Sequence, residues 1–322
     1  MIQDYIFEPV RKLFFQFQQD KNQRWYADTH SFATPGKTAG QILYSVLTSN
    51  GPAMFSRLGT SELHIILNYL GQHKHFLEKF NNYIRGTYPE FWWGKYAKED
   101  IFQQSGFFSN DGPGLEKFAQ LYLQCIPEID VLLTWLKGER HLDKYFNPAI
   151  SKTYIYDSEP YFDKMMPWTM ALENKKVLVI HPFEDSIRDQ YKKRELLFAD
   201  GRVLPDFELK TIKAFQTIKG NKPSFNNWFE ALDNLKQKID EQDFDIALIA
   251  AGAYGLPLAA HVKSIGKKGV HLGGFLQLIF GIRGARWEQC KYHRPFVNEY
   301  WKFPYQHEYP ANYKKLDHGS YW

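Results

Sequence analysis

Residues 245–274 constrain the fold of this chain most, because they read as a strand, a tight turn, a helix and a second strand. A continuous apolar run of strand length turns at Gly252 and Gly255. The helical pattern that follows ends at Gly266, where a helix end in the left-handed conformation favours glycine, and an apolar strand begins at Val270. This βαβ pattern predicts a parallel sheet.

The turn of this unit is the first candidate for a ligand-binding loop. Ligands of parallel sheets lie at the carboxyl ends of the strands, where the first N–H groups of the next helix favour an anion such as a diphosphate. We therefore expect Gly252, Ala253, Tyr254 and Gly255 to contact a nucleotide. The alternative is that the glycines serve only the turn, which every βαβ unit needs. The spacing G-x-x-G is not the dinucleotide fingerprint, so it does not indicate a nicotinamide enzyme.

Composition limits the function classes. The 322 residues can form one large α/β domain or two smaller ones. The charge is nearly balanced, with 40 basic and 36 acidic residues, so no basic patch indicates binding of nucleic acid. Cys125 and Cys290 are far apart and outside any C-x-x-C pair, which argues against disulfides and structural zinc. We expect no signal peptide and no membrane-spanning segment, and hence a cytoplasmic protein. An aromatic content of 17% suits a site for sugars or bases.

Residues 1–40 are predicted to form an N-terminal amphipathic helix and a loop. Apolar residues recur at helical spacing over the first 20 residues, with Arg11 and Lys12 between them. These apolar positions are Ile6, Val10, Leu13, Phe14 and Phe17. Such a helix docks on its own domain or lies on a membrane surface, here the inner face of the cytoplasmic membrane.

A second strand-turn-helix unit covers residues 52–63. The strand ends at Gly59, and Thr60 or Ser61 is expected to cap the helix that starts there. Arg57 at the strand end and Glu62 in the first helical turn are predicted to face the same crevice as the Gly252 loop. The alternatives are a surface ion pair for Arg57 and a favourable charge at a helix N-terminus for Glu62.

A third unit follows an aromatic-rich middle. Residues 73–172 are predicted to be a mostly helical insertion, with one helix from about Leu115 to Leu136. The run from Val177 to Ile180 then predicts a buried strand. His181 and Asp185, in the loop past its end, are the candidates for a catalytic base. The pattern Ser186-x-x-Asp189 predicts a capping box.

Two arginines near residue 284 are the last candidate ligands. Arg283 and Arg286 flank Gly284, an arrangement that suits a phosphate, with a plain surface location as the alternative. Residues 291–322 are expected to wrap the domain. The sequence thus predicts one Rossmann-like α/β domain over residues 41–290, with an open, mainly parallel sheet flanked by helices.

Three blocks together resemble the GT-D type (DUF1792-like) of bacterial glycosyltransferases over about residues 40–290. They are Arg57-Leu-Gly-Thr-Ser-Glu62-Leu, His181-Pro-Phe-x-x-Ser186-Ile and the glycine-rich run from Ala251 to Trp287, which contains Gly273 and Gly274. The resemblance implies a nucleoside-diphosphate sugar as donor, bound in part by Gly59, Thr60, Gly273 and Gly274, and a glycan or lipid-linked acceptor. It also implies a role in bacterial polysaccharide or glycoconjugate synthesis.

The family's Arg-x-Gly-Asp-x-Glu signature implies Mn²⁺ or Mg²⁺ on its two acids. Here Glu62 matches the glutamate as a metal ligand, but Thr60 stands where the aspartate would be. Because a single carboxylate is a poor site for either ion, arginines are the alternative partners of the diphosphate. We expect a glycosyltransferase; the alternatives are an inactive sugar-nucleotide-binding protein and a peripheral-membrane assembly protein of a polysaccharide pathway.

Overall fold

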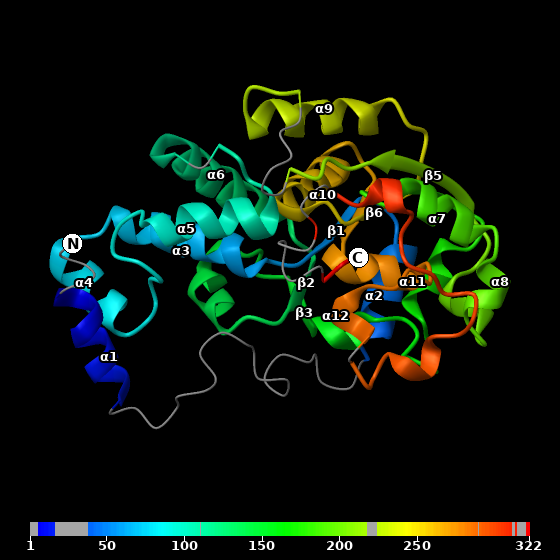
Figure 1. Ribbon diagram of the computed structural model, residues 1–322, viewed down its shortest axis with the longest axis horizontal. Helices are drawn as coiled ribbons and strands as arrows, with labels where there is room; N and C mark the ends of the chain where they lie inside the picture. The colour runs from blue at the N-terminus through cyan, green and yellow to red at the C-terminus, as the bar shows by residue number, and fades with distance from the viewer. Residues whose placement is uncertain are drawn as a thin grey trace.

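The centre of the molecule is a seven-stranded parallel sheet. The computed structural model describes residues 6–16, 38–109, 111–217, 224–288, 290–310, 313 and 320–322. The strand order is β3-β2-β1-β7-β6-β4-β5, and every neighbouring pair runs parallel (Figure 1). The strands are β1 (Ala53–Ser56), β2 (Val131–Thr134), β3 (Ser151–Tyr154), β4 (Lys176–His181), β5 (Glu208–Lys213), β6 (Ile246–Ile249) and β7 (Lys268–His271). The predicted open parallel α/β sheet is confirmed.

The central strands carry apolar side chains on both faces. Val177 and Val179 of β4 join the core on one side of the sheet, and Leu178 and Ile180 join the core on the other. Because successive side chains of a strand point to opposite faces, an uninterrupted apolar run fits a strand that is covered on both sides. The predicted buried strand after Lys175 is therefore a central strand of the sheet.

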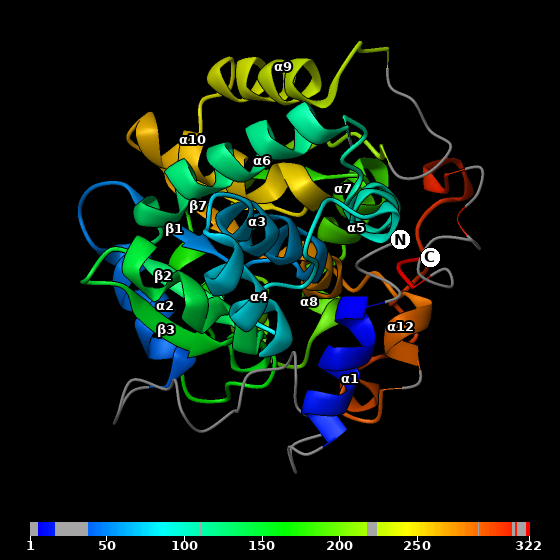
Figure 2. The ribbon, with the colours of Figure 1, turned by 90° about the vertical axis from the view of Figure 1, so that its left-hand side faces the viewer.

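Helices cover the two faces of the sheet (Figures 1 and 2). One layer contains α3 (Thr60–Gln72), α6 (Gly112–Cys125), α9 (Trp228–Asp240) and α10 (Gly255–Ser264). The other contains α2 (Ala39–Thr48), α7 (Glu184–Tyr191), α8 (Arg194–Leu197) and α11 (Leu276–Ile279). The remaining helices are α4 (Phe76–Ile84), α5 (Lys95–Asp100) and α12 (Ala285–Glu288). No helix of the described ranges is both long enough and apolar enough to cross a membrane.

Residues 245–274 form the predicted strand, turn, helix and second strand. Helix α10 connects β6 to β7, contacts both strands, and is followed by Gly266 at a φ of +81°. Strand β7 then pairs with β6 on one side and with β1 on the other. This places the loops after β1, β6 and β7 beside one another.

The aromatic-rich middle differs from the prediction in one respect. Residues 73–172 include helices, but they also supply the strands β2 and β3 to the sheet. The helix expected to run from Leu115 to Leu136 ends at Cys125. A 3-10 turn with Pro127 follows, and proline cannot donate the N–H that would continue the helix. The apolar run of β2 was indistinguishable from buried helix by its periodicity.

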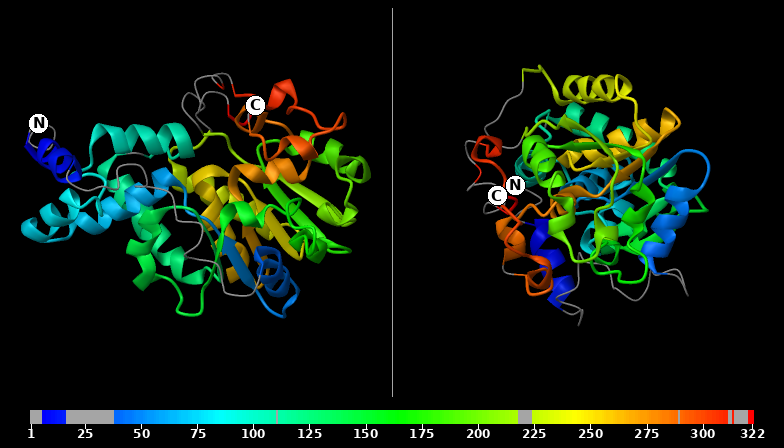
Figure 3. Two further views of the ribbon diagram at one scale, coloured as in Figure 1. Left: turned by 90° about the horizontal axis from the view of Figure 1, so that it is seen from below. Right: turned by 90° about the vertical axis from the view of Figure 1, so that its right-hand side faces the viewer.

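Helix α1 (Glu8–Gln16) docks on α4 at one end of the molecule (Figure 3). Phe7 is buried in a separate cluster with Tyr83, Ile84 and Phe91, and Arg11 donates to the Pro89 carbonyl at 2.6 Å. Other apolar residues of the predicted amphipathic face remain exposed, namely Ile6, Val10 and Leu13. Phe17, also predicted for this face, lies outside the described residues. Docking on the domain therefore uses only part of the apolar face.

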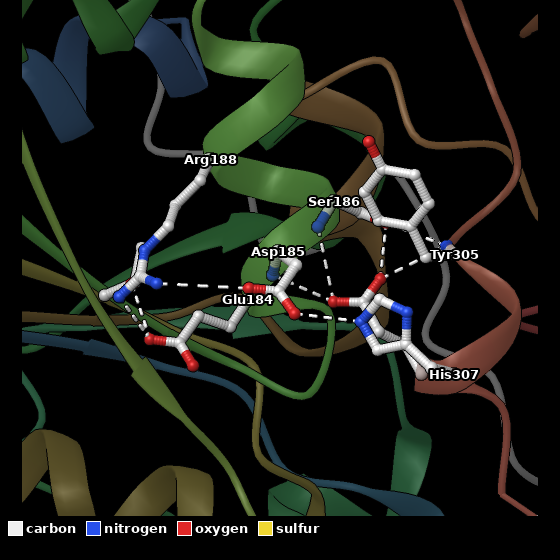
Figure 4. Close-up of polar contacts among 8 residues, drawn as sticks. Glu184, Asp185, Ser186, Arg188, Tyr305 and His307 are labelled. Carbon is white, nitrogen blue, oxygen red and sulfur yellow. Dashed lines mark hydrogen bonds and ion pairs between the residues drawn. The ribbon is translucent and has the colours of Figure 1, made fainter.

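The N-terminus of α7 is capped by Glu308 of the C-terminal segment, and not by the expected capping box. Ser186 lies inside α7, and its hydroxyl bonds the carboxylate of Glu308. The same carboxylate accepts the backbone N–H of Asp185 at 2.9 Å and that of Ser186 at 3.3 Å. Figure 4 shows this end of α7 beside Tyr305 and His307. The cap comes from more than 100 positions away in the chain, so no local pattern marks it.

Candidate functional site

The candidate site lies at the carboxyl ends of the central strands. A cavity of about 580 Å³ is lined by the residues that follow β1, β7, β6 and β4. In parallel sheets this edge is where loops of different units meet and where ligands bind. Of the predicted residues, those that line the cavity are Arg57, Gly59, Thr60, Glu62, His181, Gly252, Gly273, Gly274 and Arg286. Those that do not are Asp185, Ala253, Tyr254, Gly255 and Arg283.

Arg57 is the main cation of the cavity wall. It follows β1, its guanidinium lies 4.9 Å from the ring centre of Trp135, and Nη2 donates to the carbonyl of Leu58 at 3.3 Å. Among the described residues its Nε has no hydrogen-bond partner. Gly273 has a φ of +68°, and a Cβ at this position would lie 2.6 Å from Nη1 of Arg57. Glycine is thus needed there both for the backbone and for the close approach of the guanidinium.

Glu62 lies buried against the start of its own helix. Helix α3 begins at Thr60 with Gly59 as its N-cap residue, and neither Thr60 nor Ser61 caps it, contrary to the prediction. A Cβ on Gly59 would lie 1.8 Å from Oε2 of Glu62, so glycine makes room for the carboxylate. Burial raises the pKa of Glu62, and the charge of Arg57 opposes that rise.

Asp100 is a cavity residue that the sequence did not indicate. It is the last residue of α5, and its carboxylate accepts the hydroxyl of Ser61 at 2.5 Å. Burial raises the pKa of Asp100, which the hydrogen bond from Ser61 partly offsets. Asp100 is also close enough to Glu62 for its charge to raise the pKa of Glu62. No motif surrounds Asp100 in the chain, so only folding reveals this second carboxylate.

His271 and Ser56 form a second pair that the sequence did not indicate as functional. Nδ1 of His271, at the end of β7, lies 2.9 Å from the hydroxyl of Ser56, at the end of β1. A Cβ on Gly255 would lie 2.2 Å from Nε2 of His271. Gly255 therefore gives room to this imidazole and does not itself line the cavity. Burial, and then the charge of Arg57, lowers the pKa of His271 to about 3, so the imidazole is neutral.

His181, the predicted base, is also neutral. Burial lowers the pKa of His181 to about 3. Its Nδ1 accepts the backbone N–H of Phe183 at 2.9 Å, which leaves the proton on Nε2. A neutral imidazole in this tautomer offers a hydrogen-bond donor at Nε2, and a pKa near 3 makes it a weak base. The geometry favours His181 as a donor to a ligand rather than as a proton acceptor.

The Gly252 loop contacts the protein on one side and the cavity on the other. Gly252 has a φ of +52°, and a Cβ there would lie 2.6 Å from the carbonyl oxygen of Ser105. The next two residues face the core: the carbonyl of Ala253 accepts the hydroxyl of Tyr122 at 2.7 Å, and Tyr254 stacks on Trp228 at 4.7 Å. Of this predicted loop, Gly252 is the residue that lines the cavity.

Arg286 lines the cavity, whereas Arg283 and Asp185 do not. Arg283 binds both carboxylate oxygens of Glu288, at 2.9 and 2.6 Å. Arg286 lines the cavity with its guanidinium 4.9 Å from the ring centre of Tyr321. Asp185 accepts Nε2–H of His307 at 2.9 Å on the outer side of α7 (Figure 4). Arg286 is thus the late arginine in reach of a cavity ligand.

Glu62, the metal ligand expected from the sequence, has one other carboxylate beside it among the described residues of the cavity. The described carboxylates of the cavity are Glu62 and Asp100, of which Glu62 lies over Gly59 and Asp100 accepts a hydroxyl. Outside the cavity, the described residues Asp185, His307 and Glu308 have ligand atoms within 4.8 Å of one another. The carboxylate of Glu308, however, already caps α7. The cavity residues therefore do not fit a preformed divalent-cation site.

The buried neutral state of His271 predicts a pH effect. An unfolded chain protonates this histidine below about pH 6.5, whereas the folded chain does so only near pH 3, so His271 reduces stability as the pH falls between these values. We expect His271→Asn to make the fall in unfolding free energy between pH 6.5 and 4 shallower by about 1.4 kcal/mol per pH unit. Urea unfolding at several pH values measures this. Ser56→Ala retains the buried imidazole of His271, so its slope should match that of the wild type. An equal change of slope in Ser56→Ala would contradict the assignment of this pH effect to His271.

The comparisons with known proteins give one structural likeness. No family model and no curated protein matches the chain. A solved structure described as a selenomethionine-substituted domain of unknown function 1792 (DUF1792) matches with a TM-score of 0.34 and 13% sequence identity, covering 86% of this chain and 98% of that one.

Proposed function

We propose that this cavity binds a nucleoside-diphosphate sugar and transfers the sugar to an acceptor hydroxyl. The observation that carries the proposal is the position of Arg57, in front of the N-terminus of α3 and inside a cavity at the carboxyl ends of the central strands. Helix N-termini and arginine guanidinium groups are the usual partners of phosphate groups. The resemblance of residues 57–63 to a glycosyltransferase signature points to the same class of ligand.

The diphosphate is bound by protein groups in this proposal. Arg57 and Arg286 are the two arginines that line the cavity among the described residues. Gly59, the N-cap residue of α3, has no side chain to cap the helix, so the N–H groups of the first turn other than that of Glu62, which its own carboxylate accepts, are available to phosphate oxygens. The charge of Glu62 is near enough to Arg57 to interact with the guanidinium. Because the carboxylates do not form a ready metal site, no step of the transfer is assigned to a metal ion.

The transfer step requires a base and a stabilised leaving group. The bond between the anomeric carbon and the diphosphate oxygen breaks, and the bond from that carbon to the acceptor oxygen forms. Arg57 and the N-terminus of α3 stabilise the charge left on the diphosphate. Asp100 takes the proton of the acceptor hydroxyl, since burial raises its pKa toward the range of an effective base. His181, as an Nε2–H donor, orients the sugar.

Aromatic side chains supply the rest of the wall. Trp135, Tyr156, Phe215 and Tyr321 line the cavity with Phe183 and Trp322. Flat apolar rings of this kind stack on bases and on the faces of sugars. Their number fits a ligand with both a base and a sugar.

The second candidate function is a sugar-nucleotide-binding protein without transferase activity. The observation that favours it is the state of His181, whose protonated Nε2 and low pKa remove the predicted base. In that case Asp100 would serve binding only. A glycan assembly role at the membrane is a third candidate, for which the exposed side chains of Ile6, Val10 and Leu13 are the observation.

A thermal-shift screen with UDP, GDP, CMP, ADP and their sugars tests the binding proposal. We expect a nucleotide-selective stabilisation of roughly 2.7 kcal/mol at ligand concentrations about 100 times Kd. The shift should be the same with EDTA as with added manganese. A shift that appears only with manganese would contradict the metal-free binding mode, and no shift with any nucleotide would exclude the proposed donor.

Asp100→Asn then separates binding from transfer. We expect the nucleotide-induced shift to persist and the rate of sugar transfer to fall by about 10²-fold or more, because the amide cannot accept the proton. Asp189→Asn, on the outer side of α7 and outside the cavity, is the matched control. If wild-type protein binds the donor but transfers nothing to any acceptor, the binding-protein candidate is the correct one.

A further inference from the structure

A buried polar cluster lies outside the cavity, between the loop after β3 and the segment after α12. Its members are Glu159, Tyr161, Cys290 and His293, and none of these lines the cavity. Glu159, Tyr161 and His293 are 2%, 4% and 5% exposed, while Cys290 is half-buried. Three buried polar side chains near one half-buried cysteine are not explained by packing alone, because burying charge is costly.

The centre of the cluster is an ion pair between Glu159 and His293. Nε2 of His293 donates to Oε2 of Glu159 at 2.8 Å, and the hydroxyl of Tyr161 donates to the same oxygen. Burial lowers the pKa of His293, but the hydrogen bond and the charge of Glu159 more than offset this, so the pKa is raised from its ordinary value. Glu159 thus holds the imidazole in orientation and favours its cationic form.

The other ring nitrogen of His293 is left without a hydrogen-bond partner among the described residues, beside the turn that carries Cys290. Cys290 and His293 belong to one turn, in which the N–H of His293 donates to the carbonyl of Cys290 at 3.2 Å. Nδ1 is buried and has no hydrogen-bond partner in the part of the chain that the structure describes. Side chains three residues apart in so tight a turn lie on the same side, which places Cys290 next to the imidazole. Burial raises the pKa of Cys290, but backbone N–H groups and His293 outweigh it, and the pKa is lowered.

We propose that Cys290 is a reactive thiolate site that exchanges with small disulfides, with His293 as its cationic partner and Glu159 as the group that positions His293. In the exchange, the Cys290 thiolate attacks one sulfur of the disulfide, a new S–S bond forms, the old S–S bond breaks, and the second sulfur leaves as a thiolate. The proton of the original thiol remains on His293. Stabilisation of a thiolate by an adjacent imidazolium is the physical basis of such reactivity.

The second cysteine of the chain is an internal control. Cys125 is buried at the end of α6, and burial raises its pKa to about 12. A buried thiol with a raised pKa reacts slowly with a disulfide. The two cysteines of one folded protein therefore have opposite expected reactivities.

The test is the rate of thiol–disulfide exchange of the folded full chain with 5,5′-dithiobis(2-nitrobenzoate) between pH 5 and 9. The difference between wild type and Cys290→Ser isolates Cys290. At pH 6 we expect Cys290 to react about tenfold faster in the folded protein than in protein unfolded by guanidinium. The charged and polar groups that face the pair of Cys290 and His293 are Glu159 and Tyr161, with Tyr292 and Arg294 beside them in the chain. A folded rate equal to or below the unfolded rate would overturn the proposal.

Variants then identify the partner of the thiol. We expect His293→Asn and Glu159→Gln to slow exchange at pH 6 by about tenfold and to shift the midpoint of the rate profile to higher pH. His261→Asn, which removes an imidazole from an exposed pair with Asp240, should leave the rate unchanged. A folded His293→Asn protein with an unchanged profile would refute the role of His293. If either variant fails to fold, the wild-type profile still decides the reactivity of Cys290.

Discussion

Arg57→Ala is expected to remove most of the affinity of this protein for nucleoside diphosphates. The guanidinium lies inside the cavity, has an unpartnered Nε among the described residues, and stands in front of α3. Truncating one partner of a buried charged pair costs about 2 kcal/mol or more, which is roughly a thirtyfold rise in Kd. Isothermal titration or the thermal shift with the nucleotide selected by the screen measures the loss.

Arg283→Ala is the matched control for this variant. Arg283 is in the same part of the fold as Arg286 but pairs with Glu288 and does not line the cavity. Its removal should change Kd by less than about twofold, the scale of a surface ion pair. Equal losses in the two variants would mean that net charge, rather than the position of Arg57, governs binding. Arg57→Lys, which keeps the charge but loses the planar donor group, should bind with intermediate affinity.

Glu308→Ala is expected to destabilise the fold by about 2–4 kcal/mol. The carboxylate of Glu308 is 3% exposed and accepts backbone N–H groups of α7 at Asp185 and Ser186, as well as the N–H of Tyr305 at 3.2 Å. Alanine would leave the N–H groups of Asp185 and Ser186 without this acceptor, whereas the N–H of Tyr305 would keep the Ser186 hydroxyl at 2.9 Å, and unsatisfied buried donors are costly. Urea unfolding followed by circular dichroism gives the free energy.

Two further variants make the Glu308 result specific. Glu195→Ala removes an exposed carboxylate that pairs with Arg194 at 3.5 Å, and should change the unfolding free energy by less than about 0.5 kcal/mol. Glu308→Gln keeps one acceptor oxygen and should lie between wild type and Glu308→Ala. A loss below about 1 kcal/mol in Glu308→Ala would show that water replaces the carboxylate at the start of α7.

Much of the candidate site could be predicted because its parts follow local patterns. Arg57 and Glu62 flank the start of a helix, and Gly252 ends a strand, so each lies at a strand–helix junction that apolar periodicity marks. Junctions of this kind face one edge of a parallel sheet, whatever the order of the strands. The protonation state of His181, the predicted base, could not be predicted in this way. Its tautomer depends on the backbone N–H of Phe183, and its burial depends on the whole fold.

The amino-acid sequence by itself determined the class of fold. Apolar runs of strand length, helical stripes and glycine turns are properties of neighbouring residues, and they are sufficient to predict parallel strands joined by helices. They also determined that Arg57, Glu62 and Gly252 would meet at the strand ends.

Only the tertiary structure decided which residues complete the cavity and the caps. Insertion of β7 between β1 and β6 brings His271 to Ser56, α5 brings Asp100 to Ser61, and the C-terminal segment brings Glu308 to α7. These contacts join positions between 39 and 215 residues apart. The physical reason is that strand order and the path of the terminal segment follow from packing free energy summed over the whole chain, which no local pattern records.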